Sequence, residues 1–134
     1  MRLTSRYRFS ASHRLDTPAL TPEENQKLYG KCNNPHGHGH DYVLEITVDG
    51  PVAPDGQVVN REALDALVRE RVLARLDHKN LNADIPELVG SVTTTENLAT
   101  LVRKSLTQEW TLPARLAGVR ISETARNTFE LEVA

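Results

Sequence analysis

The fold of this chain is decided by residues 38–48, which read His-Gly-His-Asp-Tyr-Val-Leu-Glu-Ile-Thr-Val. From about Asp41 to Val48 the side chains alternate in character, which is typical of a β-strand with one buried face. The face expected to be buried carries Tyr42, Leu44, Ile46 and Val48. Side chains two apart on an extended chain point to the same side, so the imidazoles of His38 and His40 are expected on that face too.

Three other segments alternate in the same way, and two repeat apolar residues at helical spacing. The alternating segments are about Leu3–Ser12, Ala117–Glu123 and Thr128–Val133. The first helix is predicted to follow Asn60, a residue suited to the N-cap, and to reach Leu76. The second is predicted to start near Thr93, which has the capping-box spacing to Glu96. A polar loop punctuated by Pro18, Pro22 and Gly30 is predicted to follow the first strand.

The order of these elements is strand, strand, helix, helix, strand, strand. It predicts an α+β fold, in which a four-stranded antiparallel sheet carries two helices on one face. Residues 1–134 are short enough to form a single domain. A four-stranded sheet leaves two open edges, so we expect strand pairing between subunits and hence an oligomer.

Composition and charge exclude several classes of protein. No apolar run approaches the roughly 20 residues of a membrane-spanning helix. The first residues lack the apolar stretch of a signal peptide, so we expect a cytoplasmic protein with no membrane partner. The formal net charge of −2 argues against a dedicated nucleic-acid binder. The single cysteine, Cys32, excludes an intrachain disulfide.

A third histidine joins the pair that precedes the second strand. His13 follows the first strand and continues the face of Phe9 and Ala11. If the first two strands pair, the imidazoles of His13, His38 and His40 converge. Three neutral imidazoles with an open fourth position are typical of a catalytic zinc site. The alternative is a histidine-rich loop without a metal.

Two further groups lie near the predicted site. Cys32 stands in a polar, glycine-rich loop next to Lys31, where a cation would lower the pKa of the thiol. It could instead be an ordinary buried apolar residue. Asp77 and His78 follow the first helix, where the carboxylate can orient the imidazole for proton transfer. The alternative is a histidine that interacts with the helix dipole.

The remaining candidates belong to the last strands and the second helix. Glu123 continues the inward face of its strand, where a carboxylate needs a partner such as a ligand with N–H donors. A change of register at the strand end would instead turn it into water. The three threonines at residues 93–95 offer hydroxyls and free backbone N–H groups at a helix start, besides ordinary capping.

Taken in order, these segments resemble the 6-pyruvoyl-tetrahydropterin synthase / 6-carboxytetrahydropterin synthase family. The resemblance spans nearly the whole chain and rests on short motifs that are modest singly and specific together. They are Phe9-Ser10-Ala11-Ser12-His13-Arg14-Leu15, Gly30-Lys31-Cys32-Asn33-Asn34-Pro35, Gly37-His38-Gly39-His40-Asp41-Tyr42, Leu76-Asp77-His78-Lys79-Asn80-Leu81, Thr95-Glu96-Asn97-Leu98 and Glu123-Thr124.

The resemblance implies the tunnelling fold (T-fold), in which three subunits close a twelve-stranded barrel and two trimers stack into a homohexamer. It implies a zinc-dependent lyase whose substrate is 7,8-dihydroneopterin triphosphate. By matching position, Zn²⁺ would be bound by His13, His38 and His40. The catalytic residues would be Cys32 as general base, with Asp77 and His78 of a neighbouring subunit as its proton relay. The substrate-binding residues would be Glu123, as pterin anchor, and Thr94, Thr95 and Glu96, which line the pterin pocket.

Two products are compatible with the resemblance. Triphosphate loss with internal redox gives 6-pyruvoyltetrahydropterin, and further loss of acetaldehyde gives 6-carboxy-5,6,7,8-tetrahydropterin for queuosine and other deazapurines. The segment Asn33-Asn34-Pro35 is similar to the pyruvoyl-forming branch, but the absence of animal-type extensions leads us to expect the carboxy product.

The chain also departs from the family pattern. Asp41 replaces the usual Asn, and His36 stands where animal-type enzymes carry Asn. His36 and His38 could therefore form the metal-binding pair instead, but we prefer His38 and His40 because Tyr42 follows them at the family spacing. Outside the enzyme class, a non-catalytic pterin- or metal-binding oligomer and a zinc-stabilised structural protein are the other interpretations. Only the last predicts that chelation unfolds the chain.

Overall fold

A β-sheet is the central element of the fold. The computed structural model describes residues 1–134. The long strands β1 (Arg2–His13), β2 (His38–Asp49), β4 (Arg115–Thr124) and β5 (Asn127–Glu132) run antiparallel in the order β1-β2-β4-β5. The predicted α+β fold with four antiparallel strands is confirmed.

The sheet has one more strand than predicted. β3 (Lys79–Asn80) runs parallel to the outer side of β1, so the sheet is mixed and five-stranded. Two residues are too few to produce an alternating pattern, which is why the sequence does not reveal the strand. Backbone bonds from His78 N to Ser10 O (2.6 Å) and from Leu81 N to Ser12 O (2.8 Å) hold it there.

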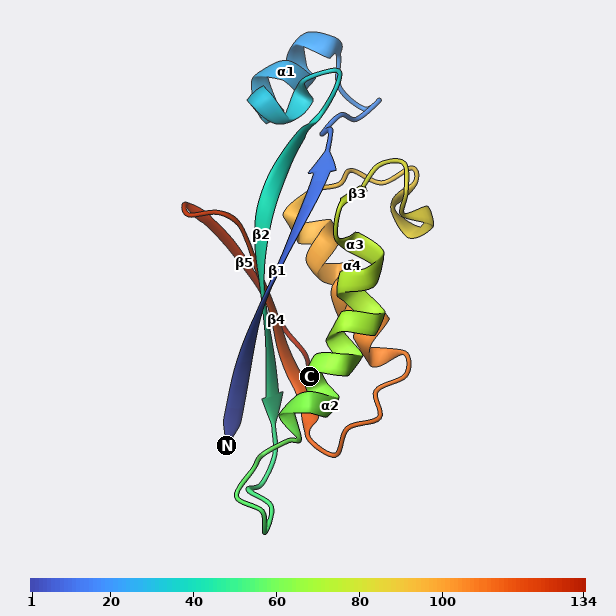
Figure 1. The fold of residues 1–134 in the computed structure, drawn as a ribbon. Coiled ribbons are helices and arrows are strands. Elements are labelled where there is room, and N and C mark those ends of the chain that lie inside the picture. The colour runs from blue at the N-terminus through green and yellow to red at the C-terminus, as the bar shows by residue number, and fades with distance from the viewer.

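Both predicted helices lie on one face of the sheet (Figure 1). The first comprises α2 (Arg61–Val68), a π-helical turn (Arg69–Leu73) and α3 (Ala74–Leu76), and the Asn60 side chain caps its first turn as predicted. The second is α4 (Thr95–Thr107), whose N-cap is Thr94 rather than Thr93. The predicted capping box at Thr93 is therefore wrong, because Thr93 is buried before the helix begins and its carbonyl accepts a hydrogen bond from the ring of His13.

The predicted polar loop is also partly wrong, because it contains the helix α1 (Pro22–Tyr29) followed by a 3-10 turn (Gly30–Asn33). Figure 1 shows α1 beyond the end of the long strands rather than on the sheet face. The helix lacks a wide apolar stripe, and this hides it from a search by periodicity. Its start signal is nevertheless in the sequence, since Thr21 and Glu24 form a reciprocal capping box.

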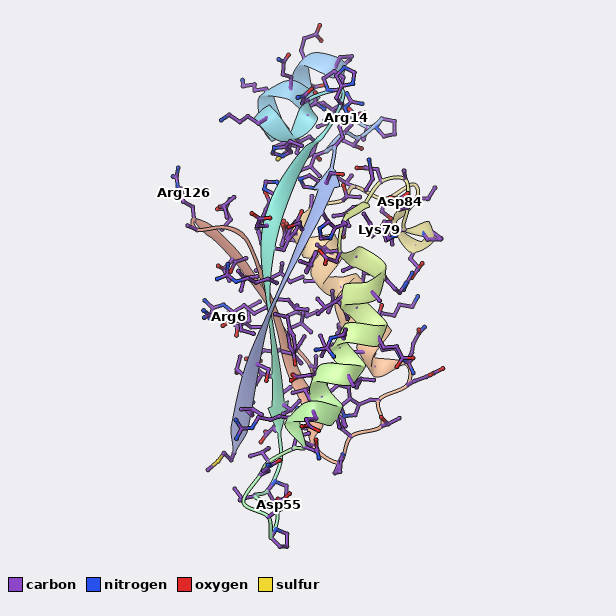
Figure 2. All side chains as sticks on the ribbon, in the orientation of Figure 1. Arg6, Arg14, Asp55, Lys79, Asp84 and Arg126 are labelled. Atoms are coloured by element: carbon purple, nitrogen blue, oxygen red, sulfur yellow. The ribbon has the colours of Figure 1, made fainter.

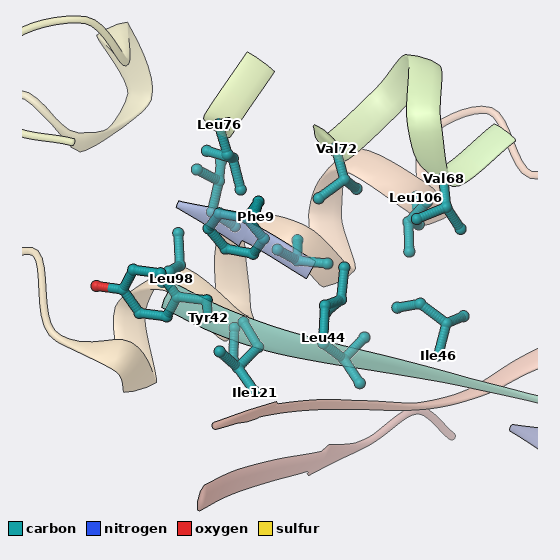
Figure 3. Close-up of a cluster of buried hydrophobic side chains, with 14 of the residues drawn as sticks. Phe9, Tyr42, Leu44, Ile46, Val68, Val72, Leu76, Leu98, Leu106 and Ile121 are labelled. Carbon is teal, nitrogen blue, oxygen red and sulfur yellow. The ribbon is translucent and has the colours of Figure 1, made fainter. Parts of the chain in front are cut away.

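The core lies between the sheet and the helices. Figure 3 shows strand residues such as Phe9, Leu44 and Ile46 packed against Val68 and Val72 of the helical layer. The opposite face of the sheet is polar: Arg6 points away from the helices (Figure 2), and Glu45 lies within 3.3 Å of both Arg6 and Arg120. The sheet therefore has one apolar and one charged face. None of the helices has the length and apolar character needed to cross a membrane.

One hydrogen bond ties the sheet to the first helix. The hydroxyl of Tyr7 donates to Asp65 Oδ1 at 2.7 Å. Burial and the nearby carboxylate raise the pKa of Tyr7, so its phenol stays protonated and remains a donor.

We predict that Tyr7→Phe destabilises the fold. The substitution keeps the ring but leaves a half-buried carboxylate without its donor, which costs about 1–3 kcal/mol. Urea unfolding followed by circular dichroism measures the loss. A change below about 0.5 kcal/mol would show that water replaces the hydroxyl at no cost.

Candidate metal centre and active site

The pairing of β1 with β2 brings the three predicted imidazoles together. His13 lies opposite His38, and Ala11 lies opposite His40. All three rings point toward the helical side of the sheet, with centroids 4.4 Å apart for His38 and His40 and 5.0–5.5 Å apart for the pairs with His13. The chain between the strands must turn close to His13, since a Cβ on Gly37 would lie only 2.8 Å from the carbonyl oxygen of His13.

Cys32 completes this cluster. The 3-10 turn after α1 carries it, and its carbonyl accepts from Leu15 N at 2.6 Å. Its Sγ lies 3.0 Å from His38 Nε2. One ligand atom from each of His13, Cys32, His38 and His40 lies within 4.8 Å of the others, so these four residues form a candidate metal site. His36 is exposed and outside the cluster, which favours the His38–His40 pair over the His36–His38 alternative.

The hydrogen bonds of His13 suit a metal ligand. Its Nδ1 lies 2.9 Å from the carbonyl oxygen of Thr93, which can only accept, so Nδ1 carries the proton. Burial lowers the pKa of His13 and keeps the ring neutral, which leaves a lone pair on Nε2. That atom lies 3.1 Å from His40 Nε2, so two ring nitrogens face the same small space. A backbone carbonyl that orients one ring nitrogen and frees the other is typical of histidine ligands, and the donor set fits zinc.

Glu123 faces the cluster rather than water. The β4–β5 register shifts between Ser122 and Thr124, yet the Glu123 side chain is only 14% exposed. One carboxylate oxygen lies 3.3 Å from His40 Nε2, and the other accepts from the hydroxyl of Thr95 at 2.5 Å. The predicted inward orientation is confirmed, and the first turn of α4 holds the carboxylate in place.

The other residues predicted to line the pterin pocket differ in their burial. Thr95 is 2% exposed, whereas Thr94 is half-buried and uses its hydroxyl to cap α4. Glu96 is exposed on the first turn of the helix. The threonine run therefore combines the two roles weighed from sequence: one hydroxyl caps the helix and the next faces the site.

Asp77 and His78 form a pair at a different place. Asp77 Oδ1 accepts from Ser10 N at 2.9 Å and lies 3.0 Å from His78 Nδ1, so the carboxylate orients the ring. His78 has a positive φ of 60°, and its side chain is 82% exposed. The pair lies along the outer edge of β1, beside β3. His78 borders an open hollow of about 510 Å³ that Lys79 and Asp41 also line. Within one subunit it is not part of the Cys32 cluster.

Two residues of the site are not evident from sequence. The Thr93 carbonyl orients His13, and no sequence pattern marks a backbone group for such a role. Tyr42, assigned from sequence only to the buried strand face, has its ring edge against His40, with centroids 5.6 Å apart. Burial, followed by the charges of Glu123 and Cys32, raises the pKa of Tyr42. The period-two continuation from His40 is the only sequence signal that places it there.

An α+β fold with a histidine and cysteine cluster beside a half-buried carboxylate defines a protein with a candidate metal site next to a group that can bind a polar ligand. The family model described as 6-pyruvoyl tetrahydropterin synthase matches residues 2–133, so the chain belongs to this family of enzymes. The solved 6-pyruvoyl tetrahydropterin synthase of Caenorhabditis elegans superimposes with a TM-score of 0.92 at 35% identity, covering 100% of this chain and 96% of that one. This likeness supports the tunnelling fold of the subunit.

Curated relatives are similar over most of their length. The 6-pyruvoyl tetrahydrobiopterin synthase of Dictyostelium discoideum is 48% identical over 126 residues, covering 93% of this chain and 90% of that protein. The human enzyme of the same name is 44% identical over 127 residues, covering 93% and 86%.

The carboxy branch matches less well. A probable 6-carboxy-5,6,7,8-tetrahydropterin synthase of Halobacterium salinarum is 35% identical over 84 residues, covering 63% of this chain and 45% of that protein. The comparisons therefore favour the pyruvoyl alternative over the carboxy product that we expected from sequence.

We predict that the cluster, and not His36, determines metal content. His13→Ala should lower zinc affinity at least about tenfold, because it removes a ligand already oriented by the Thr93 carbonyl. His36→Ala, the control histidine in the exposed turn before β2, should bind zinc like the wild type. Elemental analysis after dialysis against buffered zinc measures both. Loss of zinc in His36→Ala with retention in His13→Ala would reverse the ligand assignment.

Proposed function

We propose that this protein is a zinc-dependent 6-pyruvoyl tetrahydropterin synthase. It would eliminate triphosphate from 7,8-dihydroneopterin triphosphate and rearrange the remaining side chain to the pyruvoyl group. The main support for the proposal is the contact of Glu123 with His40, which joins a half-buried carboxylate to the histidine cluster. The sequence identity of 44–48% to the two 6-pyruvoyl tetrahydrobiopterin synthases named above supports the same product.

Zinc would be held by His13, His38 and His40. When bound, it would polarise the hydroxyl groups of the substrate side chain and make the neighbouring carbon-bound protons more acidic. The neutral rings of His13 and His40 suit this role, because burial lowers the pKa of both.

Cys32 would be the general base that takes the carbon-bound proton. Its sulfur lies 3.0 Å from His38 Nε2, beside the proposed zinc ligands. Burial and the charge of Glu123 raise the pKa of Cys32. Formation of the thiolate would therefore require a cation, such as the proposed zinc ion, beside the sulfur. A base next to the site of bond cleavage typically contributes about 10²–10⁴-fold to the rate.

Asp77 and His78 would relay the proton for a neighbouring subunit. Their contact of 3.0 Å orients the imidazole, and the exposure of His78 leaves the ring accessible at the edge of the sheet. Because this pair lies outside the Cys32 cluster of its own chain, the role needs the homohexamer that the family resemblance implies. The edge of β5, and the length of β1 that β3 does not pair, give three subunits a route to a closed barrel.

Glu123 would anchor the pterin ring. A carboxylate that binds two adjacent N–H groups makes charge-assisted, bidentate hydrogen bonds, which are stronger than neutral ones. Thr95 holds this carboxylate from the first turn of α4. Thr94 and Glu96, the sequence neighbours of Thr95, would also line the pterin pocket.

The product is the first test. The zinc-loaded protein is incubated with 7,8-dihydroneopterin triphosphate, and the products are identified by mass spectrometry. We expect 6-pyruvoyltetrahydropterin and inorganic triphosphate. Carboxytetrahydropterin with acetaldehyde would assign the carboxy branch instead, and intact substrate would reduce the role to pterin or metal binding.

We predict that Cys32→Ala lowers kcat by about 10²–10⁴-fold, because it removes the base. Zinc content and oligomeric state should stay at wild-type values, which elemental analysis and light scattering can check. Full turnover in the variant would refute the assignment of the base. Loss of zinc would instead identify Cys32 as a fourth ligand.

A further inference from the structure

Tyr42 carries the one buried side-chain nitrogen or oxygen in the molecule without a hydrogen-bond partner. The residue is 1% exposed, and its ring is part of the apolar core. A hydroxyl buried without a partner loses its hydrogen bonds to water, which destabilises the fold. A phenylalanine would fill the same space without that cost, so the hydroxyl requires an explanation.

The surroundings of the ring place the hydroxyl at the site rather than deep in the core. The ring stacks on Phe9, with centroids 4.9 Å apart, and meets the ring of His40 edge-on. Val43 and Ser122 form the last pair of the β2–β4 ladder, and Tyr42 and Glu123 are the next residues of the two strands beyond it. Figure 3 shows the oxygen of Tyr42 pointing out of the apolar cluster, away from Leu44 and Ile46.

The neighbouring polar groups are already engaged with one another. Glu123 uses one oxygen for Thr95 and turns the other to His40, while Cys32 contacts His38. The phenol, whose ring lies against His40, is thus left as a hydrogen-bond donor without a partner. A pterin ring presents nitrogen and carbonyl acceptors beside the N–H groups that a carboxylate binds, so a pterin held by Glu123 can offer the missing acceptor.

We propose that Tyr42 is a substrate-binding residue whose hydroxyl donates a hydrogen bond to the pterin ring that Glu123 binds beside His40. This inference rests on the proposed function, because it assumes a pterin at Glu123. It explains why a tyrosine occupies a core position: the hydroxyl is unpaired in the free protein and paired in the complex.

The test compares Tyr42→Phe with Tyr7→Phe. The control variant removes a hydroxyl from the same buried side of the sheet, where its partner is Asp65 on the first helix and not the site. We expect Tyr42→Phe to lower kcat/KM and the affinity for unsubstituted pterin (2-amino-4-oxopteridine) about tenfold, as the loss of one hydrogen bond requires. Its midpoint of urea unfolding should stay the same or rise. Tyr7→Phe should show the opposite pattern, with a lower midpoint and unchanged kcat/KM and pterin affinity.

Three results would overturn the inference. Unchanged kcat/KM and pterin affinity in Tyr42→Phe, with an active wild type, would mean that water satisfies the hydroxyl. Dissociation of the assembly in this variant would mean that the hydroxyl meets a neighbouring subunit. A wild type that neither turns over the triphosphate nor binds pterin would refute the proposed function together with the inference, so the two failures are distinguishable.

Discussion

The register between β1 and β2 is the constraint on which the site depends. His13 pairs with His38, and two steps along, Ala11 pairs with His40. Because side chains alternate across a strand, a slip of one residue would move the rings of one strand to the polar face. The same register buries Phe9 against Tyr42, so the free energy of packing the core also enforces the position of the cluster. The candidate metal site and the core therefore depend on the same strand register.

The start of α4 adds a second constraint. The carbonyl of Thr93 orients His13, the hydroxyl of Thr94 caps the helix, and the hydroxyl of Thr95 holds Glu123. Three consecutive threonines thus connect a proposed zinc ligand, a helix terminus and the proposed pterin anchor. The start of a helix is well suited to holding such side chains, because the first residues of a helix have free backbone N–H groups. The apolar stripe that packs on the sheet fixes the position of the helix.

Much of this arrangement follows from local patterns in the sequence. Alternation locates the long strands and puts His38, His40 and Glu123 on the inward face, and helical spacing locates both helices of the covering layer. The elements that these patterns do not predict depend on individual contacts, several of them between segments far apart in the sequence. The helix after Pro22 has a capping box but no broad apolar stripe, and β3 is held by backbone bonds to β1. The helix α4 starts after Thr94 because Thr93 is buried at His13, 80 residues away in the sequence.

The division of polar groups within one chain bears on the proposed assembly. The proposed zinc ligands, Cys32 and Glu123 form one group on the helical side of the sheet, whereas the Asp77–His78 pair lies along the outer side of β1. A proton relay needs its groups within hydrogen-bond reach of one another or of a bridging water. If His78 serves Cys32, the edge of one subunit must therefore meet the site of the next. On that account the open edges of the sheet are part of the catalytic arrangement, since closing the barrel would both pair the strands and bring the relay to the base.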